Sequence, residues 1–232
     1  MSETPFALSE LPWSPLALAA DIEAGNSAGT VWNGAEIVIW RDSRGSLHAW
    51  EDRCPHRGMK LSFGFVRGDR LACLYHGWEF GDDATCRYIP AHPELAVPPT
   101  IRVARYKAAE ALGMVWVAHP DAAEPSPEDS HAVFGLRSLQ IDRSAPEIAD
   151  LICRVGLPGC GGLNMPERLG PLIRWRQGDL GLIAGLQPMT DASCTLHLGM
   201  ESDLPGTERA AMISATVALR TLAESSRSEG LS

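Results

Sequence analysis

Residues 54–78 have the sequence CPHRGMKLSFGFVRGDRLACLYHGW, the most specific pattern in the chain. It contains two short loops, Cys54-Pro-His56 and Cys73-Leu-Tyr-His76, and sixteen residues separate His56 from Cys73. Each loop presents one thiol and one imidazole. Two such loops side by side can enclose a two-iron cluster, with the cysteines on one iron and the histidines on the other. A glycine follows each histidine and permits a tight turn in which backbone N–H groups point at sulfur.

A zinc site is the alternative for the same four side chains, because zinc accepts two cysteines and two histidines. Zinc sites usually have a pair of cysteines followed by a pair of histidines. Here the ligands alternate, as Cys-x-His and then Cys-x-x-His. This order favours the two-iron cluster over zinc.

The same stretch resembles the Rieske signature of bacterial ring-hydroxylating and demethylating oxygenases. The resemblance includes Arg57 and Gly58 after the first histidine and the Tyr-His-Gly-Trp run that ends at Trp78. Flanking segments look similar as well: Leu11-Pro12-Trp13, the strand ending at Trp50, Ile89-Pro90-Ala91 and Gly113–Val117. The resemblance implies one 2Fe–2S cluster, with the ligands Cys54, His56, Cys73 and His76.

The expected fold is mainly β, with a Rieske-type antiparallel β-sandwich domain at residues 8–119. A linker is predicted at 120–130, because PDAAEPSPEDS is acidic and rich in proline. Residues 131–224 are expected to form a small α+β C-terminal region, a reduced remnant of the oxygenase catalytic domain. Residues 225–232 are predicted to be a disordered tail.

Short β-rich runs separated by turn residues predict antiparallel hairpins. Arg41–Gly45 and Val66–Arg70 are the expected turns. The expected strands lie at 36–40, 47–50, 71–74, 114–118, 133–141, 172–177, 180–186 and 194–200. Apolar residues at near-helical spacing predict a helix over Thr207–Ala223, with Thr207 as its cap.

Two departures from the respiratory Rieske branch bear on the reduction potential. That branch has an additional cysteine in each loop, and the two form a disulfide; Met59 and Tyr75 stand at these positions. It also has a serine where Trp78 stands, and that serine donates a hydrogen bond to a cluster sulfur. Losing this donor destabilises the reduced state, so we expect a potential of about −150 mV, the low end of the Rieske range. Arg57, Met59 and Trp78 are expected to rim the cluster as part of a docking face.

The second half lacks a recognisable mononuclear iron site. Such a site needs two histidines and a carboxylate on one face, and in the family the two histidines lie close together on one helix. Beyond residue 120 only His131 and His197 remain, 66 residues apart. Both are interpreted as ordinary surface or core histidines, and His92 as a loop residue. Cys153, Cys160 and Cys194 match no metal motif and are interpreted as small buried hydrophobes.

Composition limits the class of partner and the compartment. Hydrophobic residues make up 45% and charged residues 21%, ordinary values for a globular protein. The net charge of −9 argues against non-specific nucleic-acid binding, which needs a basic face. No secretory signal or membrane span is evident, so a cytoplasmic location is expected.

Three functions remain open. The first is an electron-transfer component that takes electrons from a reductase or ferredoxin and passes them to a mononuclear iron on an oxygenase partner subunit in a hetero-oligomer. In that case the chain alone would have no oxygenase activity. The second is a complete monooxygenase or demethylase with an unrecognised iron site. The third is a regulatory subunit that keeps the cluster as a structural element or redox sensor.

Overall fold

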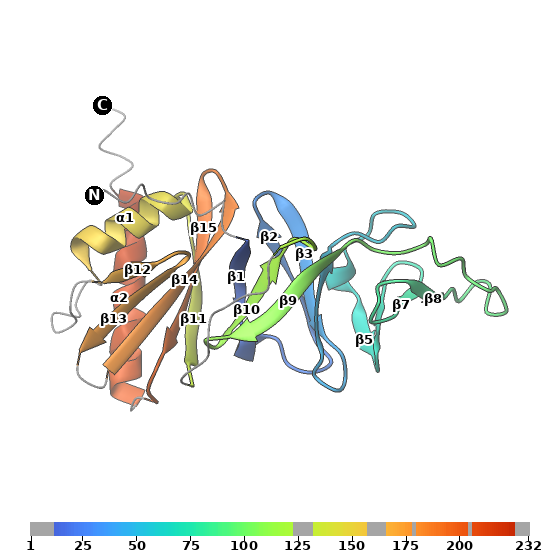
Figure 1. The fold of residues 1–232 in the computed structure, drawn as a ribbon, viewed down its shortest axis with the longest axis horizontal. Helices are drawn as coiled ribbons and strands as arrows, with labels where there is room; N and C mark the ends of the chain where they lie inside the picture. The colour runs from blue at the N-terminus through green and yellow to red at the C-terminus, as the bar shows by residue number, and fades with distance from the viewer. Residues whose placement is uncertain (1–11, 123–131, 157–165, 178–179, 204–205, 226–232) are drawn as a thin grey trace.

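The computed structural model describes residues 12–122, 132–156, 166–177, 180–203 and 206–225. In this part of the chain, three antiparallel sheets follow one another along the long axis, and two α-helices cover the outer side of one terminal sheet (Figure 1). The mainly β fold class predicted from the sequence is confirmed, including the smaller α+β part at its C-terminal side.

The middle sheet has six strands in the order β1-β10-β9-β4-β3-β2. It contains the predicted strands 36–40, 47–50 and 114–118, and the expected hairpin joins β3 to β4. The hairpin turn is held by the buried carboxylate of Asp42, which accepts backbone N–H bonds from Arg44 and Ser46, both 2.8 Å long. The strand bounds are β1 (Trp13–Leu18), β2 (Ser27–Trp32), β3 (Ala35–Arg41), β4 (Leu47–Glu51), β9 (Arg105–Ala111) and β10 (Met114–Ala118), and a 3-10 turn, η2 (Ala19–Asp21), follows β1.

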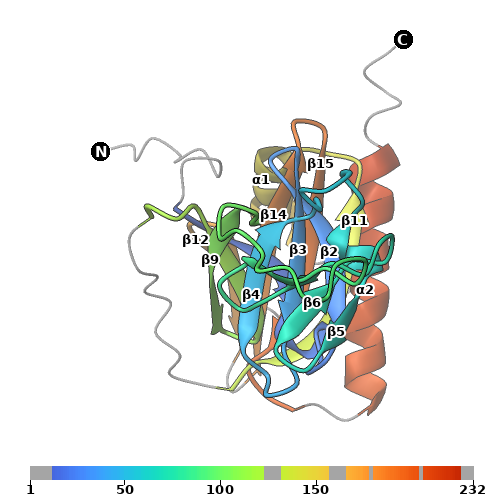
Figure 2. The same cartoon turned by 90° about the vertical axis from the view of Figure 1, so that its right-hand side faces the viewer.

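A small four-stranded sheet, β5-β6-β7-β8, forms one end of the molecule and faces the viewer in Figure 2. Its elements are η3 (Leu61–Phe63), β5 (Phe65–Arg67), β6 (Arg70–Ala72), β7 (Glu79–Phe80) and β8 (Cys86–Tyr88). The turn predicted at Val66–Arg70 is shorter than expected, because only Gly68 and Asp69 lie between β5 and β6. The strand predicted at 71–74 is wrong beyond Ala72: the chain leaves the sheet at Cys73 and turns to form the second loop.

The third sheet has five strands in the order β11-β15-β14-β13-β12. All four strands predicted after residue 132 are present, and one of them, β14, continues to Thr190. The bounds are β11 (Phe134–Ile141), β12 (Glu167–Leu169), β13 (Leu172–Gln177), β14 (Leu180–Thr190), β15 (Ser193–Met200), α1 (Ala145–Val155) and α2 (Gly206–Ser225). The helix predicted at Thr207–Ala223 is α2, but it begins at Gly206, so Thr207 lies in its first turn and is not its cap.

Helix α1 was not predicted, although the sequence contains its start signal. Ser144 and Glu147 form a capping box, and Pro146 lies in the first turn. Ile148 and Ile152 follow on one face and are fully buried against the five-stranded sheet. The helix has only 11 residues, near the lower limit of length at which an apolar run can be told from a strand by its period.

The five-stranded sheet packs its other face on the middle sheet. Gly185 of β14 is needed there, because a Cβ atom would lie 2.6 Å from the Met114 sulfur and 2.9 Å from Pro15. Further along, the backbone N–H groups of Asn33 and Gly34 donate to carbonyl groups of β14. This packing sets the small sheet at the opposite end of the molecule from the helices (Figure 1).

Within the described residues, no helix is both long and apolar enough to span a membrane.

Candidate metal centre

The two predicted ligand loops lie next to the four-stranded sheet and share one backbone pattern. In the first, the N–H of Cys54 donates to the carbonyl of Met59 and the N–H of Gly58 donates to the carbonyl of Cys54, both at 2.8 Å. The second loop repeats both bonds at the matching positions around Cys73 and Gly77, at 2.9 and 3.0 Å. The loops are therefore built alike, although the histidine stands two residues after one cysteine and three after the other.

The glycine in each loop has a structural reason. Gly58 has φ +73° and Gly77 has φ +68°, in the left-handed region that other residues rarely adopt. At Gly77 the space is also closed, because a Cβ atom would lie 3.0 Å from Cγ of Pro90. The backbone thus turns sharply at each cysteine.

The two thiols lie together in the interior. Cys54 and Cys73 are each 2% exposed, are not joined by a disulfide, and interact with each other through their side chains. Burial raises the pKa of the Cys54 thiol to about 11, and the neighbouring Cys73 raises it further against the lowering effect of N–H bonds from His56 and Arg57. Two thiolates side by side in this interior need a compensating positive charge, which ferric iron supplies. The pair therefore fits one iron of a cluster.

The two imidazoles lie together at the surface. His56 and His76 are both exposed, with ring centroids 4.6 Å apart. Desolvation, together with the charges of His76 and Arg57, lowers the pKa of His56. This favours the neutral imidazole, the form that binds metal. Donors arranged as an inner pair of thiols and an outer pair of imidazoles suit two irons, whereas a zinc ion needs four donors around one point.

Aromatic rings stack on both histidines. The Trp78 indole stacks on His56 at 4.3 Å between centroids, and the Tyr75 ring stacks on His76 at 3.9 Å. Trp78 is half-buried, whereas the other six tryptophans are buried. Of the expected rim residues, Arg57 is exposed and Met59 is half-buried. The stack of Tyr75 on His76 was not anticipated from the sequence.

Two further arginines near the first loop were also not anticipated. Arg53 and Arg102 line a groove of about 350 Å³ together with Arg57 and His56. Arg53 directly precedes a predicted ligand, which is a usable signal. Arg102 is distant in the chain and reaches the loop only through the fold, so no local pattern indicates it.

The remaining candidates from the sequence lie away from the loops. His197 is 3% exposed and hydrogen-bonded on both ring nitrogens, and Cys194 is fully buried in the core beneath the helices, as expected for core residues. Cys153 is half-buried on α1 and His92 is exposed in a loop. His131 and Cys160 lie outside the described residues. Among the residues described, no three His, Cys, Asp or Glu side chains form a group that could hold a single metal ion.

Comparison with known proteins shows which family the part of the chain around the two loops resembles. The family description "Rieske 2Fe-2S domain" matches residues 12–102. Oxidoreductase NdmD of Pseudomonas putida is 38% identical over 105 residues, which are 45% of this chain and 18% of that protein. The 4beta-methylsterol monooxygenase of Methylococcus capsulatus is 44% identical over 94 residues, which are 39% of this chain and 25% of that protein. The chain thus spans a quarter or less of the length of these relatives.

The fold of most of the chain, beyond residues 12–102, is also similar to that of solved structures. NdmA of Pseudomonas putida CBB5 has a TM-score of 0.68 at 18% identity, covering 92% of this chain and 80% of that one. Dicamba Monooxygenase has a TM-score of 0.65 at 20% identity, covering 91% of this chain and 86% of that one. At these identities the likeness concerns the fold, including that of the C-terminal part.

Proposed function

Residues 12–102 are a Rieske 2Fe-2S domain of the oxygenase and oxidoreductase group, and from this we propose that the chain is the electron-transfer component of an oxygenase system. A Rieske domain binds one 2Fe–2S cluster, which supplies reversible one-electron storage. Cys54 and Cys73 would hold one iron of the cluster, and His56 and His76 would hold the other. We also propose residues 8–119 as the cluster-bearing domain and residues 131–224 as the C-terminal region.

The separation of thiols from imidazoles carries this proposal. Cys54 and Cys73 are each 2% exposed, whereas His56 and His76 lie on the surface. The buried thiols exclude water from the inner iron, and the exposed imidazoles give a partner protein a short path for electrons. The Trp78 ring stacks on the face of the His56 imidazole, and the Tyr75 ring stacks on the face of the His76 imidazole.

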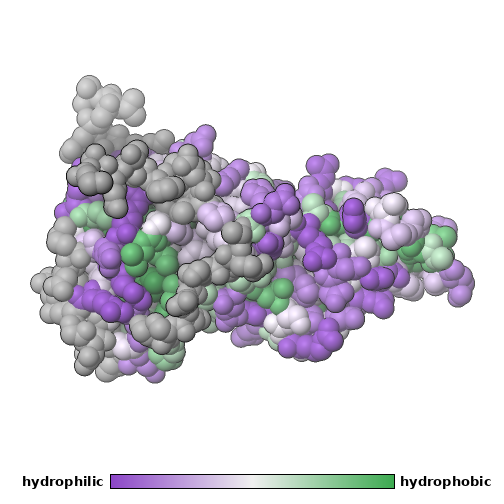
Figure 3. Space-filling model, viewed as in Figure 1, coloured by the Kyte–Doolittle hydropathy of each residue, from purple (hydrophilic) through white to green (hydrophobic). Residues whose placement is uncertain are grey.

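The proposed partners are a reductase or ferredoxin donor and an oxygenase subunit that holds a mononuclear iron. Apolar surface at the cluster end supports protein contact there, since the cores of protein interfaces are apolar. Half of the large hydrophobic side chains that are exposed in the described residues belong to this end: Phe63, Phe65, Leu74, Tyr75 and Leu95. Figure 3 shows hydrophobic surface at this tip, next to hydrophilic surface.

Iron analysis and electron paramagnetic resonance test the ligand assignment. We expect about two irons per chain and a Rieske-type signal after dithionite. Cys73→Ser removes an inner ligand and should abolish both. Cys86→Ser is the matched control, because Cys86 is also buried, at 3% exposed, but its thiol contacts the carbonyl of Tyr88. Full iron content in Cys73→Ser would overturn the assignment.

A complete monooxygenase is the second candidate. The fold likeness to Dicamba Monooxygenase favours it, because the likeness covers 91% of this chain. A mononuclear site would raise the iron content to about three per chain. If about one iron per chain remains in Cys73→Ser, which lacks the cluster, this candidate is favoured. If cluster-loaded wild type contains only about two irons per chain, the electron-transfer component is favoured.

A further inference from the structure

A groove of about 350 Å³ lies directly beside the first ligand loop. His56 forms part of its wall, so a protein seated in the groove contacts an exposed ligand imidazole. Three arginines, Arg53, Arg57 and Arg102, and one acidic residue, Glu51, contribute its charged side chains. All three arginines are exposed.

These three arginines form no ion pair with any residue that the structure describes. Their basic neighbours at the same end of the molecule are neutralised. Arg67 and Arg70 share Glu79, at 3.1 and 3.2 Å, Arg70 also pairs with Asp69 at 3.8 Å, and Lys60 pairs with Glu36 at 2.6 Å. The uncompensated positive charge is therefore concentrated in the groove.

The local charge is opposite to that of the whole chain. The net charge is −9, but residues 51–79, which include the groove's Glu51, contain five basic residues and four acidic residues. At physiological ionic strength the screening length is about 8 Å, so the distant acidic residues have little effect at the groove. A partner approaching the first loop meets positive charge.

We propose that the arginine groove, defined by Arg53, Arg57 and Arg102, is the docking site for an acidic electron-donor protein. The inference rests on the proposed electron-transfer function and specifies the donor's charge and its position. In this step the donor loses one electron and this chain gains it, with no proton or atom transferred. Opposite charges speed association and orient the donor so that its redox centre faces His56.

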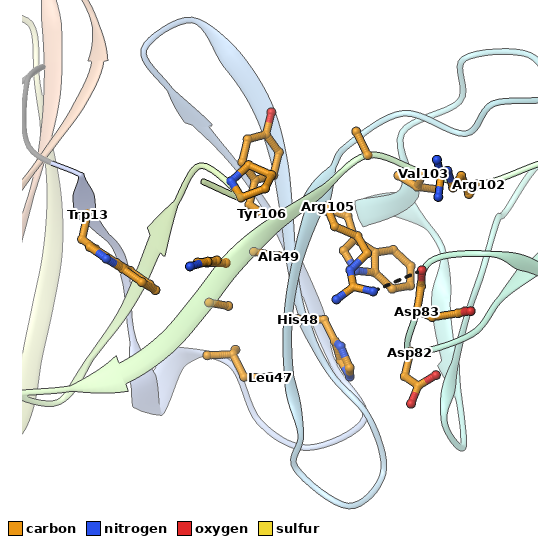
Figure 4. Close-up of a pocket in the computed structure, with 15 residues that line it drawn as sticks. Trp13, Leu47, His48, Ala49, Asp82, Asp83, Arg102, Val103, Arg105 and Tyr106 are labelled. Atoms are coloured by element: carbon orange, nitrogen blue, oxygen red, sulfur yellow. Dashed lines mark hydrogen bonds between the residues drawn. The ribbon is translucent and has the colours of Figure 1, made fainter. Parts of the chain in front are cut away.

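The adjoining groove does not extend the docking site. It meets the arginine groove at Arg102 and Val103 and continues along β9 (Figure 4). There the positive charges of Arg105 and Lys107 are balanced by the carboxylates of Asp82 and Asp83, and Arg105 also donates to the backbone carbonyl of Asp83. An acidic partner is therefore attracted to the side of Arg102 that faces the first loop.

The test compares charge reversals in the cluster-loaded full chain. Arg102→Glu removes groove charge without touching either ligand loop, and Arg53→Glu/Arg102→Glu removes more. Arg154→Glu is the matched control: Arg154 is also exposed and without an ion pair among the described residues, but it lies in the last turn of α1, at the other end of the molecule (Figure 1). The probe is a reduced acidic plant-type 2Fe–2S ferredoxin, whose potential lies below that of Rieske clusters. Stopped-flow reduction rates and calorimetric affinities for the oxidised ferredoxin are measured across a salt series.

We expect Arg102→Glu to lower the association rate and the affinity about tenfold at low salt, with a larger loss in the double variant and little change in Arg154→Glu. Reduced methyl viologen, a cation, should reduce all variants at least as fast as wild type. Equal effects of Arg102→Glu and Arg154→Glu on the ferredoxin would overturn the docking site. If wild type binds phosphate and Arg102→Glu does not, while the ferredoxin rates are unchanged, the groove is a small-anion site. That result would also overturn the proposed docking site. A wild-type chain that viologen cannot reduce would instead contradict the electron-transfer function.

Discussion

The indole of Trp78 lies parallel to the imidazole of His56, with an interplanar angle of 4° and ring centroids 4.3 Å apart. The two residues belong to different loops, so the stack ties the first loop to the second. The orientation of a ligand imidazole affects how it binds its metal. We therefore propose Trp78 as a positioning residue for the candidate ligand His56.

Replacing Trp78 should loosen the His56 ring without removing a ligand. We expect Trp78→Ala to keep about two irons per chain but to destabilise the loaded protein by about 2 kcal/mol, because stacking and partly buried surface are lost. Cluster loss to an iron chelator should be faster, and the electron paramagnetic resonance lines should broaden. Trp78→Phe retains a stacking ring and should restore most of both properties. If the alanine and phenylalanine variants have the same line width, the stack does not orient His56.

The reduction potential tests the effect of Trp78 in a second way. The indole stands where the respiratory branch has a hydroxyl that donates to a cluster sulfur, and without that donor the reduced cluster is less stable. A redox titration monitored by visible absorption should give about −150 mV. A midpoint near +300 mV, the top of the Rieske range, would refute the hydrogen-bond argument.

Gly77 and Gly68 form a matched pair for testing the second loop. Both have positive φ, +68° and +63°, so alanine should cost each about 1 kcal/mol in unfolding free energy. Only at Gly77 does a Cβ atom meet a neighbour, Pro90 at 3.0 Å; at Gly68 nothing lies within 4 Å. Gly77→Ala should therefore displace the loop that carries His76 and lower the iron content, while Gly68→Ala keeps it. Equal iron content in the two variants would show that the loop tolerates the contact.

The sequence indicated some residues of the candidate site but not others. Cys54 and Cys73 could be singled out because ligand spacing is a local property, and the structure brings their side chains together. Arg102 could not, because it reaches the first loop only after the chain has passed through the small sheet. Features set by tertiary packing leave no mark on local spacing.

The same distinction holds for the fold. The apolar run of β10 is buried along its whole length and was predicted directly from its residues. The strand β6 stops at Ala72, earlier than its apolar pattern indicates, because the next residue belongs to the second loop. The local apolar pattern predicts the strand β6, but the turn of the second loop at Cys73 determines where this strand ends.

A buried chain of hydrogen bonds joins the two larger sheets through His197. Gln187 donates from its amide to Thr30 and Val31 of β2, both at 2.6 Å, so its carbonyl is left to accept from Nε2 of His197 at 2.9 Å. The other ring nitrogen, Nδ1, lies 2.9 Å from Oγ of Ser138, whose hydroxyl also lies 3.4 Å from a carboxylate oxygen of Asp21. The ring is 3% exposed, and this burial favours the neutral imidazole, because the charged form would lose its hydration.

Stability should therefore fall as His197 is forced to take up a proton. Burial lowers the pKa of His197 from 6.5 to about 4. Between these values the unfolded chain binds a proton that the folded chain does not, so this contribution is fully present above pH 6.5 and is lost as the pH falls toward 4. From pH 7 to about pH 5 the loss is about 2 kcal/mol. Urea unfolding of wild type and His197→Gln at both pH values isolates the effect, because every other acid-sensitive group, the candidate cluster ligands included, is common to both proteins. The wild type should lose more stability than the variant over this interval; parallel losses would mean that His197 is protonated in the folded protein as readily as in the unfolded chain.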